Sequence, residues 1–554
     1  MQASKSHLNL ISRRSFLDRG LKTGAAVALG TLMDIPLVMK KALAEGSIGL
    51  NGKKVLFIWL RGANDGLNSL IPALDPAYST SRPTIGIPLD PGTDYSTTGA
   101  ADFPTSGAGS TYGSYPYAVR LGNGFAALHP SLKFMAPVYN AGDLALIHRV
   151  AYPSQSRSHF DSQRYWENGL PDNNLVNEGI FYRAMLEHIL DQGANASPLT
   201  GVSIQSSLPL ILRGSDAPMT NLTDPLRYDL LGIPNSTNGN TKALAYLNAA
   251  NKYPFPEKRN RGLLSLQYQN LSETLDIFGG ISTQFTEAGN TFRDDEVTDG
   301  DSTWAAGNGG EGYYLFPTTG DKNGGWRRPG GATDFNKYAV PTSLHGFFNN
   351  LKAAAVILNK TDAIVAGTEF GGFDTHNIQG QLTGDHPNLN RGFGWAMYAL
   401  RKYFTRYADK ATWNDIVVVT LTEFGRTTIE NTTQGTDHAE AGAMFVAGGA
   451  IKGYNATPGS SGVFNCNPND TTVASNLRWA TGTSGSMFGV NGRYLKRTTD
   501  FRQVLGEVIR KHLGATQNQL NRIIPGYASE STERLLAGGT SYDGTLIRGE
   551  LGLL

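Results

Sequence analysis

Four short clusters of acidic and imidazole side chains are the parts of this 554-residue chain best suited to chemistry. Each follows a predicted strand or lies in an adjoining loop: Asp65, Asp374 with His376, Glu423, and Asp437 with His438. Mixed carboxylate and imidazole ligands suit zinc, manganese or iron, whereas a set dominated by carboxylates suits calcium or magnesium. One or two such divalent ions would lower the pKa of a bound water and stabilise both oxygens of an in-line displacement. The residue types therefore predict a metal site.

Each cluster also has a purely structural interpretation. Asp65 precedes Gly66 and could shape a turn. Asp374 and His376 could cap a loop, and Glu423 could form an ion pair with Arg426. The metal interpretation gains weight for Asp374 and His376 because both follow one predicted strand.

A fifth cluster brings a hydroxyl, an imidazole and a guanidinium together at Arg157, Ser158 and His159. Ser158 could act as a nucleophile activated by a metal or by His159, with Arg157 binding an oxyanion. Arg426, which follows a glycine, is a second candidate for binding the oxyanion. Adjacent side chains on an extended segment point in opposite directions, so helix capping by Ser158 is the alternative.

Alternating strand and helix patterns predict the elements that position these residues. Continuous apolar runs at 53–60, 143–148, 363–368, 415–422 and 443–449 are typical of buried strands, and helices are expected at 125–139, 181–190, 268–278, 389–404 and 501–513. This alternation predicts an α/β fold with a doubly wound, mostly parallel sheet and helices on both faces. Ligands of such sheets bind outside the carboxyl ends of the strands.

The first 44 residues predict export. Ser12-Arg13-Arg14-Ser15-Phe16-Leu17 precedes a weakly apolar segment, and Ala42-Leu43-Ala44 is typical of a cleavage site. We therefore expect a twin-arginine signal peptide over 1–44, transport by the twin-arginine translocation machinery, and a periplasmic or extracellular protein. Residues 45–554 are expected to form one domain, with loop-rich insertions near 78–120 and 285–340.

Composition excludes several classes of function. The net charge is +1, and removal of seven basic and two acidic leader residues leaves about −4, so the mature chain has no basic surface for nucleic acid. No later segment is apolar for long enough to span a membrane. Cys466 is the only cysteine, which argues against iron–sulfur and structural zinc sites. Asp470 stands where a sulfatase-type modified cysteine site would need arginine.

Five motifs occur in order along the chain and together resemble the DUF1501 family. They are Leu60-Arg61-Gly62-Ala63-Asn64-Asp65-Gly66-Leu67-Asn68, Ser156-Arg157-Ser158-His159-Phe160, Phe373-Asp374-Thr375-His376, Thr422-Glu423-Phe424-Gly425-Arg426-Thr427 and Gly435-Thr436-Asp437-His438. This resemblance implies a twin-arginine-exported protein related to the alkaline phosphatase and sulfatase superfamily. It also implies that Asp65, Asp374, His376, Glu423 and His438 are metal ligands. The superfamily's Asp-x-x-x-His spacing is shortened here to Asp374-Thr375-His376, and its Asp-His pair after a central strand is Glu423-Phe424.

These observations lead to two hypotheses of function. The first is an exported metal-dependent hydrolase of phosphate or sulfate esters, whose substrate is a small-molecule or carbohydrate ester. The second is a non-catalytic binding or structural protein of the cell envelope that retains the hydrolase fold. Fold-level resemblance alone does not decide between them.

Overall fold

The computed structural model describes residues 48–102, 116–192, 197, 199–226, 245, 273–294, 313–319, 324, 340–455, 460–466, 493–528, 534–540 and 546–554. The predicted leader and parts of both predicted insertions lie outside these residues.

A nine-stranded sheet forms the centre of the protein, in the order β15-β5-β12-β11-β1-β10-β6-β7, with β16 also paired to β5. Its strands are β1 (Lys54–Leu60), β5 (Leu144–Ala151), β6 (Gly201–Ile204), β7 (Thr220–Leu222), β10 (Val365–Phe370), β11 (Ile416–Leu421), β12 (Gly442–Ala447), β15 (Val463–Phe464) and β16 (Thr499–Asp500). All neighbours are parallel except β12, which is antiparallel to both β11 and β5. The mostly parallel α/β sheet is therefore confirmed.

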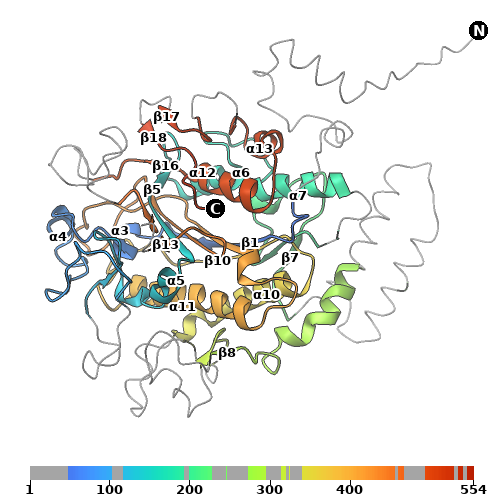
Figure 1. Ribbon diagram of the computed structural model, residues 1–554, viewed down its shortest axis with the longest axis horizontal. Coiled ribbons are helices and arrows are strands. Elements are labelled where there is room, and N and C mark those ends of the chain that lie inside the picture. The colour runs from blue at the N-terminus through green and yellow to red at the C-terminus, as the bar shows by residue number, and fades with distance from the viewer. Residues whose placement is uncertain are drawn as a thin grey trace, which may run out of the picture.

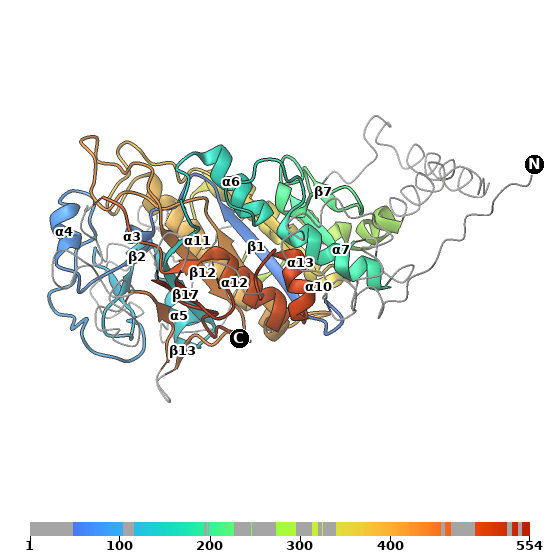
Figure 2. The same cartoon turned by 90° about the horizontal axis from the view of Figure 1, so that it is seen from above.

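Helices cover both faces of this sheet, as predicted (Figure 1). On one side lie α5 (Met135–Asn140), α10 (His345–Lys360) and α11 (Asp385–Arg406). On the other side lie α6 (His159–Asn168), α7 (Ile180–Gln192), α12 (Phe501–Glu507) with the π-helical turn Val508–His512, and α13 (Gln517–Ile523). This second group lies above β1 in Figure 1, and Figure 2 views the molecule from the side of this group, with β1 crossing the middle.

Strand β1 explains why both faces need helices. Its seven residues are all buried, and the six apolar ones alternate between two hydrophobic cores. Leu56, Ile58 and Leu60 pack in the core with α10 and α11. Val55, Phe57 and Trp59 pack in the core with α7 and α12. A strand buried on both sides reads as a continuous apolar run, which is why it was predictable.

Smaller elements surround the main sheet. They are α3 (Gly66–Ser69), α4 (Ala77–Ser81), the sheet of β2 (Leu70–Ile71), β4 (Ala127–Leu128) and β3 (Val119–Arg120), and the two-stranded pairs β8 (Arg293–Asp294) with β9 (Tyr313–Tyr314), β13 (Tyr454–Asn455) with β14 (Ser460–Ser461), and β17 (Gly539–Thr540) with β18 (Leu546–Ile547). Within the described residues, no helix has the length and hydropathy required to cross a bilayer.

The helix predicted over 125–139 is wrong in its first half. Residues 127–128 form β4, which pairs with β2 and β3. A short 3₁₀ helix at Pro130–Leu132 follows, and α5 begins only at Met135. Pro130 lacks an N–H and fixes its backbone φ angle, so it starts a helix where the periodic apolar pattern suggested an interior.

Candidate functional site

Four loops meet at the carboxyl ends of the central strands of the sheet, because these strands are parallel. Strands β11, β1 and β10 are parallel neighbours, so their carboxyl ends lie side by side. The loops after them carry Asp65, Asp374 with His376, and Glu423 with Arg426. Strand β12 is antiparallel to β11, so the loop that enters it, with His438, reaches the same edge.

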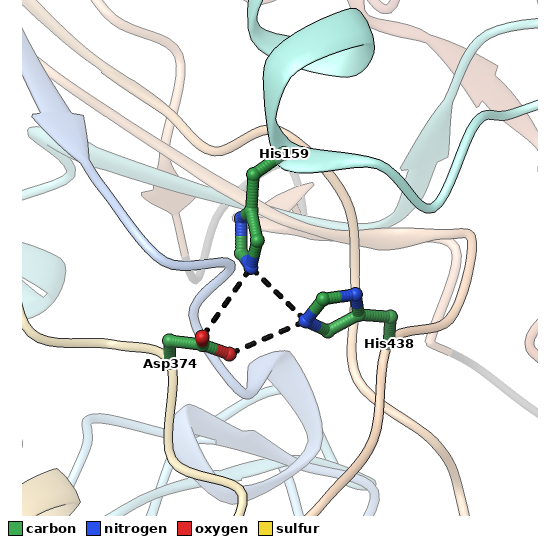
Figure 3. Close-up of side chains that lie close together, drawn as sticks. All are labelled: His159, Asp374 and His438. Carbon is green, nitrogen blue, oxygen red and sulfur yellow. Dashed lines mark hydrogen bonds and ion pairs between the residues drawn. The ribbon is translucent and has the colours of Figure 1, made fainter.

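His159, Asp374 and His438 form the centre of the site (Figure 3). One ligand atom from each lies within 4.8 Å of the others, and this group could hold a metal ion. The Nε2 atoms of His159 and His438 are 3.0 Å apart. Asp374 places Oδ2 3.5 Å from the first ring and Oδ1 3.3 Å from the second. These separations resemble the edge of about 3.3 Å between ligands of a tetrahedral zinc ion.

His376 adds a third imidazole to this group. Its Nε2 lies 3.0 Å from Nε2 of His438 and 3.0 Å from Oδ1 of Asp374. Nε2 of His438 and the carboxylate of Asp374 therefore each lie close to the Nε2 atoms of the other two rings, which come from α6 and from the loop after β10.

The outer nitrogen of each ring faces an oxygen. Nδ1 of His159 lies 2.7 Å from Oε1 of Glu423, and Nδ1 of His376 lies 3.3 Å from Oδ1 of Asp437. Nδ1 of His438 lies 2.9 Å from the carbonyl oxygen of Arg157. Carbonyl and carboxylate oxygens only accept hydrogen bonds, so each Nδ1 carries a hydrogen. In a neutral ring, the Nε2 atom then presents a lone pair toward the centre of the site. Oxygen partners of this kind orient metal-binding histidines.

Burial and neighbouring charges shift the pKa values of the groups in this site in different directions. Burial alone would raise the pKa of Asp374, but the hydrogen bond and charge of Arg426 outweigh it and lower the pKa to about 2. Burial lowers the pKa of His438, and the nearby Arg426 charge adds to this effect. The Glu423 hydrogen bond raises the pKa of His159. The Asp374 side chain is 46 % exposed, so its carboxylate remains accessible from solvent.

Arg426 holds the loops together and does not point outward to bind an oxyanion. Its guanidinium is fully buried and donates to the carbonyl oxygens of Gly62, Ala63, Phe373 and Thr436, and also to Asp374. All the contacts of this side chain are therefore within the protein. They join the loops after β1 and β10 to the loop before β12.

Glu423 lies behind His159. The side chain is fully buried, and Oε1 accepts from the Gly62 amide at 2.9 Å and from Gln163 at 3.1 Å, besides facing His159. Oε2 is buried and has no hydrogen-bond partner within the described residues. These contacts make Glu423 the oxygen partner of His159.

Helix α6 positions His159 as its first residue. Ser158 is the N-cap, and its Oγ accepts from the Asp161 amide at 3.4 Å. The helix is tied to the loop after β11, because Ser162 and Gln155 both donate to the carbonyl oxygen of Glu423. The capping interpretation of Ser158 thus has a direct geometric basis.

Arg157 extends outward from the same segment. It is exposed, and its guanidinium lies 4.9 Å from the ring centroid of Tyr494 and donates to the tyrosine hydroxyl at 2.5 Å. Arg493 also lies over this ring and donates to Asp437 at 3.2 Å. Arg157 and Arg493 therefore place two guanidinium groups near the outer partners of His438 and His376.

Asp65 lies near the site, but both of its carboxylate oxygens bind groups other than the candidate metal ligands. It is fully buried, its Oδ2 pairs with Arg82 at 2.6 Å and accepts from Gln379 at 2.7 Å, and its Oδ1 caps α3 through the Leu67 amide at 3.2 Å. Burial alone would raise the pKa of Asp65, but the charge of Arg82 outweighs it and lowers the pKa. These contacts agree with the turn-forming interpretation.

Sequence reasoning missed the residues that support the ligands. Gln163 lies four residues after His159, a spacing that places both on one face of α6, and this signal was available. Gln379 and Arg82 had no such signal, because their partners come from distant loops.

The family comparison agrees with the resemblance seen in the motifs. Residues 336–476 match the model of a family described as "Protein of unknown function (DUF1501)", a segment that holds Asp374, His376, Glu423, Asp437 and His438. No curated protein and no solved structure matches the chain.

Proposed function

We propose that this chain, matched to DUF1501 between residues 336 and 476, is an exported metal-dependent hydrolase of phosphate or sulfate esters. The observation that carries this proposal is that Nε2 of His438 and the carboxylate of Asp374 each lie close to the Nε2 atoms of His159 and His376, and that the outer nitrogen of each ring faces an oxygen. When the rings are neutral, the lone pairs of neighbouring Nε2 atoms and the Asp374 carboxylate repel one another, and a metal cation between them would remove this repulsion.

The donor set fits a transition metal better than calcium or magnesium. Imidazole suits zinc, manganese or iron, whereas calcium and magnesium prefer oxygen ligands. His159, Asp374 and His438 would hold the ion, with His376 as a further ligand. When bound, such an ion lowers the pKa of a water molecule and polarises an ester oxygen.

The chain's own groups complete the site. Arg426 keeps Asp374 ionised, and Glu423 fixes the orientation of His159. Exposed Arg157 is available to bind an anionic ester group, because guanidinium groups match the geometry of phosphate and sulfate oxygens. Water is the nucleophile that fits best, since Ser158 serves as a helix cap. Relationship to the alkaline phosphatase superfamily and action in the periplasm or outside the cell are parts of the same proposal.

Metal content and turnover test the proposal together. The mature protein is expected to carry stoichiometric metal and to cleave aryl phosphate or aryl sulfate esters. Replacement of both Asp374 and His438 by alanine should remove the metal and the activity. His188→Asn is the matched control, because His188 contacts the Ile48 carbonyl outside the site. Wild-type protein without metal would refute the proposal, and metal without turnover would favour the binding-protein alternative.

Two Ser158 variants test the nucleophile. Ser158→Ala should cost about 1 kcal/mol of stability through loss of the cap. Ser158→Asp should preserve the cap. Both variants should keep metal and turnover. Abolished turnover in both, with unchanged metal, would assign the attack to Ser158.

A further inference from the structure

Gln379 lies beneath the candidate metal site and contacts three separate segments. It is fully buried, and its Oε1 accepts from the hydroxyls of Thr375 at 2.9 Å and Thr436 at 2.8 Å. Its Nε2 donates to Oδ2 of Asp65 at 2.7 Å. The carboxylate of Asp65 can only accept, so the orientation of the amide is fixed.

The two threonines connect Gln379 directly to the ligands. Thr375 lies between Asp374 and His376, and Thr436 lies two residues before His438. The Thr436 amide also donates to the Thr375 carbonyl at 3.1 Å, so the two loops touch at this point. One buried oxygen atom therefore binds both loops that supply Asp374, His376 and His438.

The third contact anchors Gln379 to a rigid base. Asp65 is paired with Arg82, whose side chain is fully buried. Arg82 also donates to Asn68 and to the carbonyl oxygens of Thr427 and Thr428. Gln379 is thus bound to an ion pair that is itself fixed by several hydrogen bonds.

The backbone next to Gln379 is strained. Ile378 has a φ angle of +43°, which is rare for a β-branched residue. Its amide and that of Gln379 donate to the carbonyls of Thr433 and Gln434. Strained conformations persist where the surrounding structure imposes them, and they gather at functional sites. Here the strain accompanies the turn that directs the Gln379 amide inward.

We propose that Gln379 is a positioning residue that sets the separation of the two ligand loops through Thr375 and Thr436. This inference deepens the proposed function and rests on the same metal site. Loss of the amide removes the common acceptor of the two hydroxyls, so His376 and His438 should lose their fixed separation. Groups that hydrogen-bond directly to metal ligands typically contribute about 10- to 100-fold to metal affinity, so Gln379, which acts through the two threonines, should contribute about 10-fold, at the lower end of this range.

Gln379→Met tests the proposal, because methionine has a similar length and no strong hydrogen-bonding group. Gln503→Met is the matched control, since Gln503 is also fully buried and bonds the Leu535 carbonyl in the α12 region. The first readout needs no metal. In ¹⁵N-histidine-labelled metal-free protein, the ring signals of His376 and His438 should shift in Gln379→Met, while that of His512 should not. In Gln503→Met, the His376 and His438 signals should stay in place.

The second readout is zinc affinity, which should fall about 10-fold in Gln379→Met and stay unchanged in Gln503→Met. Should Gln379→Met not fold, Thr436→Val removes one of the two hydroxyls and should give a smaller change of the same kind. Unchanged ring signals together with unchanged affinity would overturn the role of Gln379. If the wild type binds no zinc but the ring signals still shift, the proposed function fails and the positioning role stands.

Discussion

The carboxylate of Glu423 shows how single residues define this site. It is buried, it accepts three hydrogen bonds through one oxygen, and one of those comes from His159. Burial alone would raise the pKa of Glu423, but the His159 hydrogen bond and the Gly62 amide contribute to lowering it. An ionised partner behind a histidine increases the basicity of the ring and fixes its orientation.

Glu423→Gln should therefore weaken metal binding about 10- to 100-fold while the fold is kept. The amide retains the shape of the side chain but removes the charge that faces Nδ1 of His159. Isothermal titration with zinc measures the effect. Glu430→Gln is the control, because Glu430 binds Thr84 instead of a ligand histidine. Equal affinities of Glu423→Gln and wild type would contradict the role assigned to Glu423.

At the scale of residues, the sequence predicted the chemical types well and their arrangement less well. Asp374, His376 and His438 follow or precede strands, so their meeting at one edge could be foreseen. The sequence suggested His159 only as a base that activates Ser158. Its place among the candidate metal ligands was missed, because nothing in the sequence shows that α6 directs its first residue toward loops more than 200 residues away. Arg426 was expected to face a substrate, and its burial among four carbonyls could not be predicted from neighbours in sequence.

At the scale of elements, close approach of two loops depends on Gly62. This glycine has a φ angle of +106°, and a Cβ there would lie 2.4 Å from the backbone nitrogen of Asp374. The loops after β1 and β10 therefore touch through backbone atoms, without room for a side chain. Neighbouring Gly371 has open space around its Cβ position.

Gly62→Ala should destabilise the protein by about 2–4 kcal/mol, since it combines an unfavourable φ angle with overpacking. It should also weaken zinc binding, because the Asp374 backbone must move. Gly371→Ala, in the same loop as Asp374, should change neither property appreciably. Urea unfolding and zinc titration of the two variants check this expectation. Equal stability of both variants would show that the loops can separate without cost.

The strands were predictable and their directions were not. Apolar runs located β1, β5, β10, β11 and β12 to within a few residues. The antiparallel direction of β12 follows from the connection 422–441, which contains no helix to carry the chain back across the sheet. The antiparallel direction of β12 brings His438 to the site, so the topology of the sheet determines where this side chain lies.

At the scale of the whole molecule, buried histidines link stability to pH. Burial lowers the pKa of His148, His386 and His512 to about 4, and that of His129 to about 3. In an unfolded chain the same groups titrate near 6.5. The unfolded state therefore binds more protons on acidification, so this stability is fully present above pH 6.5 and is lost as the pH falls toward 4.

Each of these histidines should reduce the unfolding free energy by about 1 kcal/mol between pH 7.5 and 5.5. Urea unfolding at both values measures the loss. In His512→Gln, the loss should be smaller by about one quarter, because the amide can still donate to the Lys54 and Asp415 carbonyls but does not titrate. An identical pH dependence in wild type and His512→Gln would contradict this account.

The edge strands of the central sheet are short, which affects how readily the sheet can pair with other chains. One border is β7, with three residues, and the other consists of β15 and β16, with two residues each. Long unpaired border strands invite pairing with other chains, whereas very short ones offer few free main-chain groups. Within the described part of the chain, the sheet therefore presents few free main-chain groups for pairing with another chain, even though its central strands β1 and β11 are continuous apolar runs.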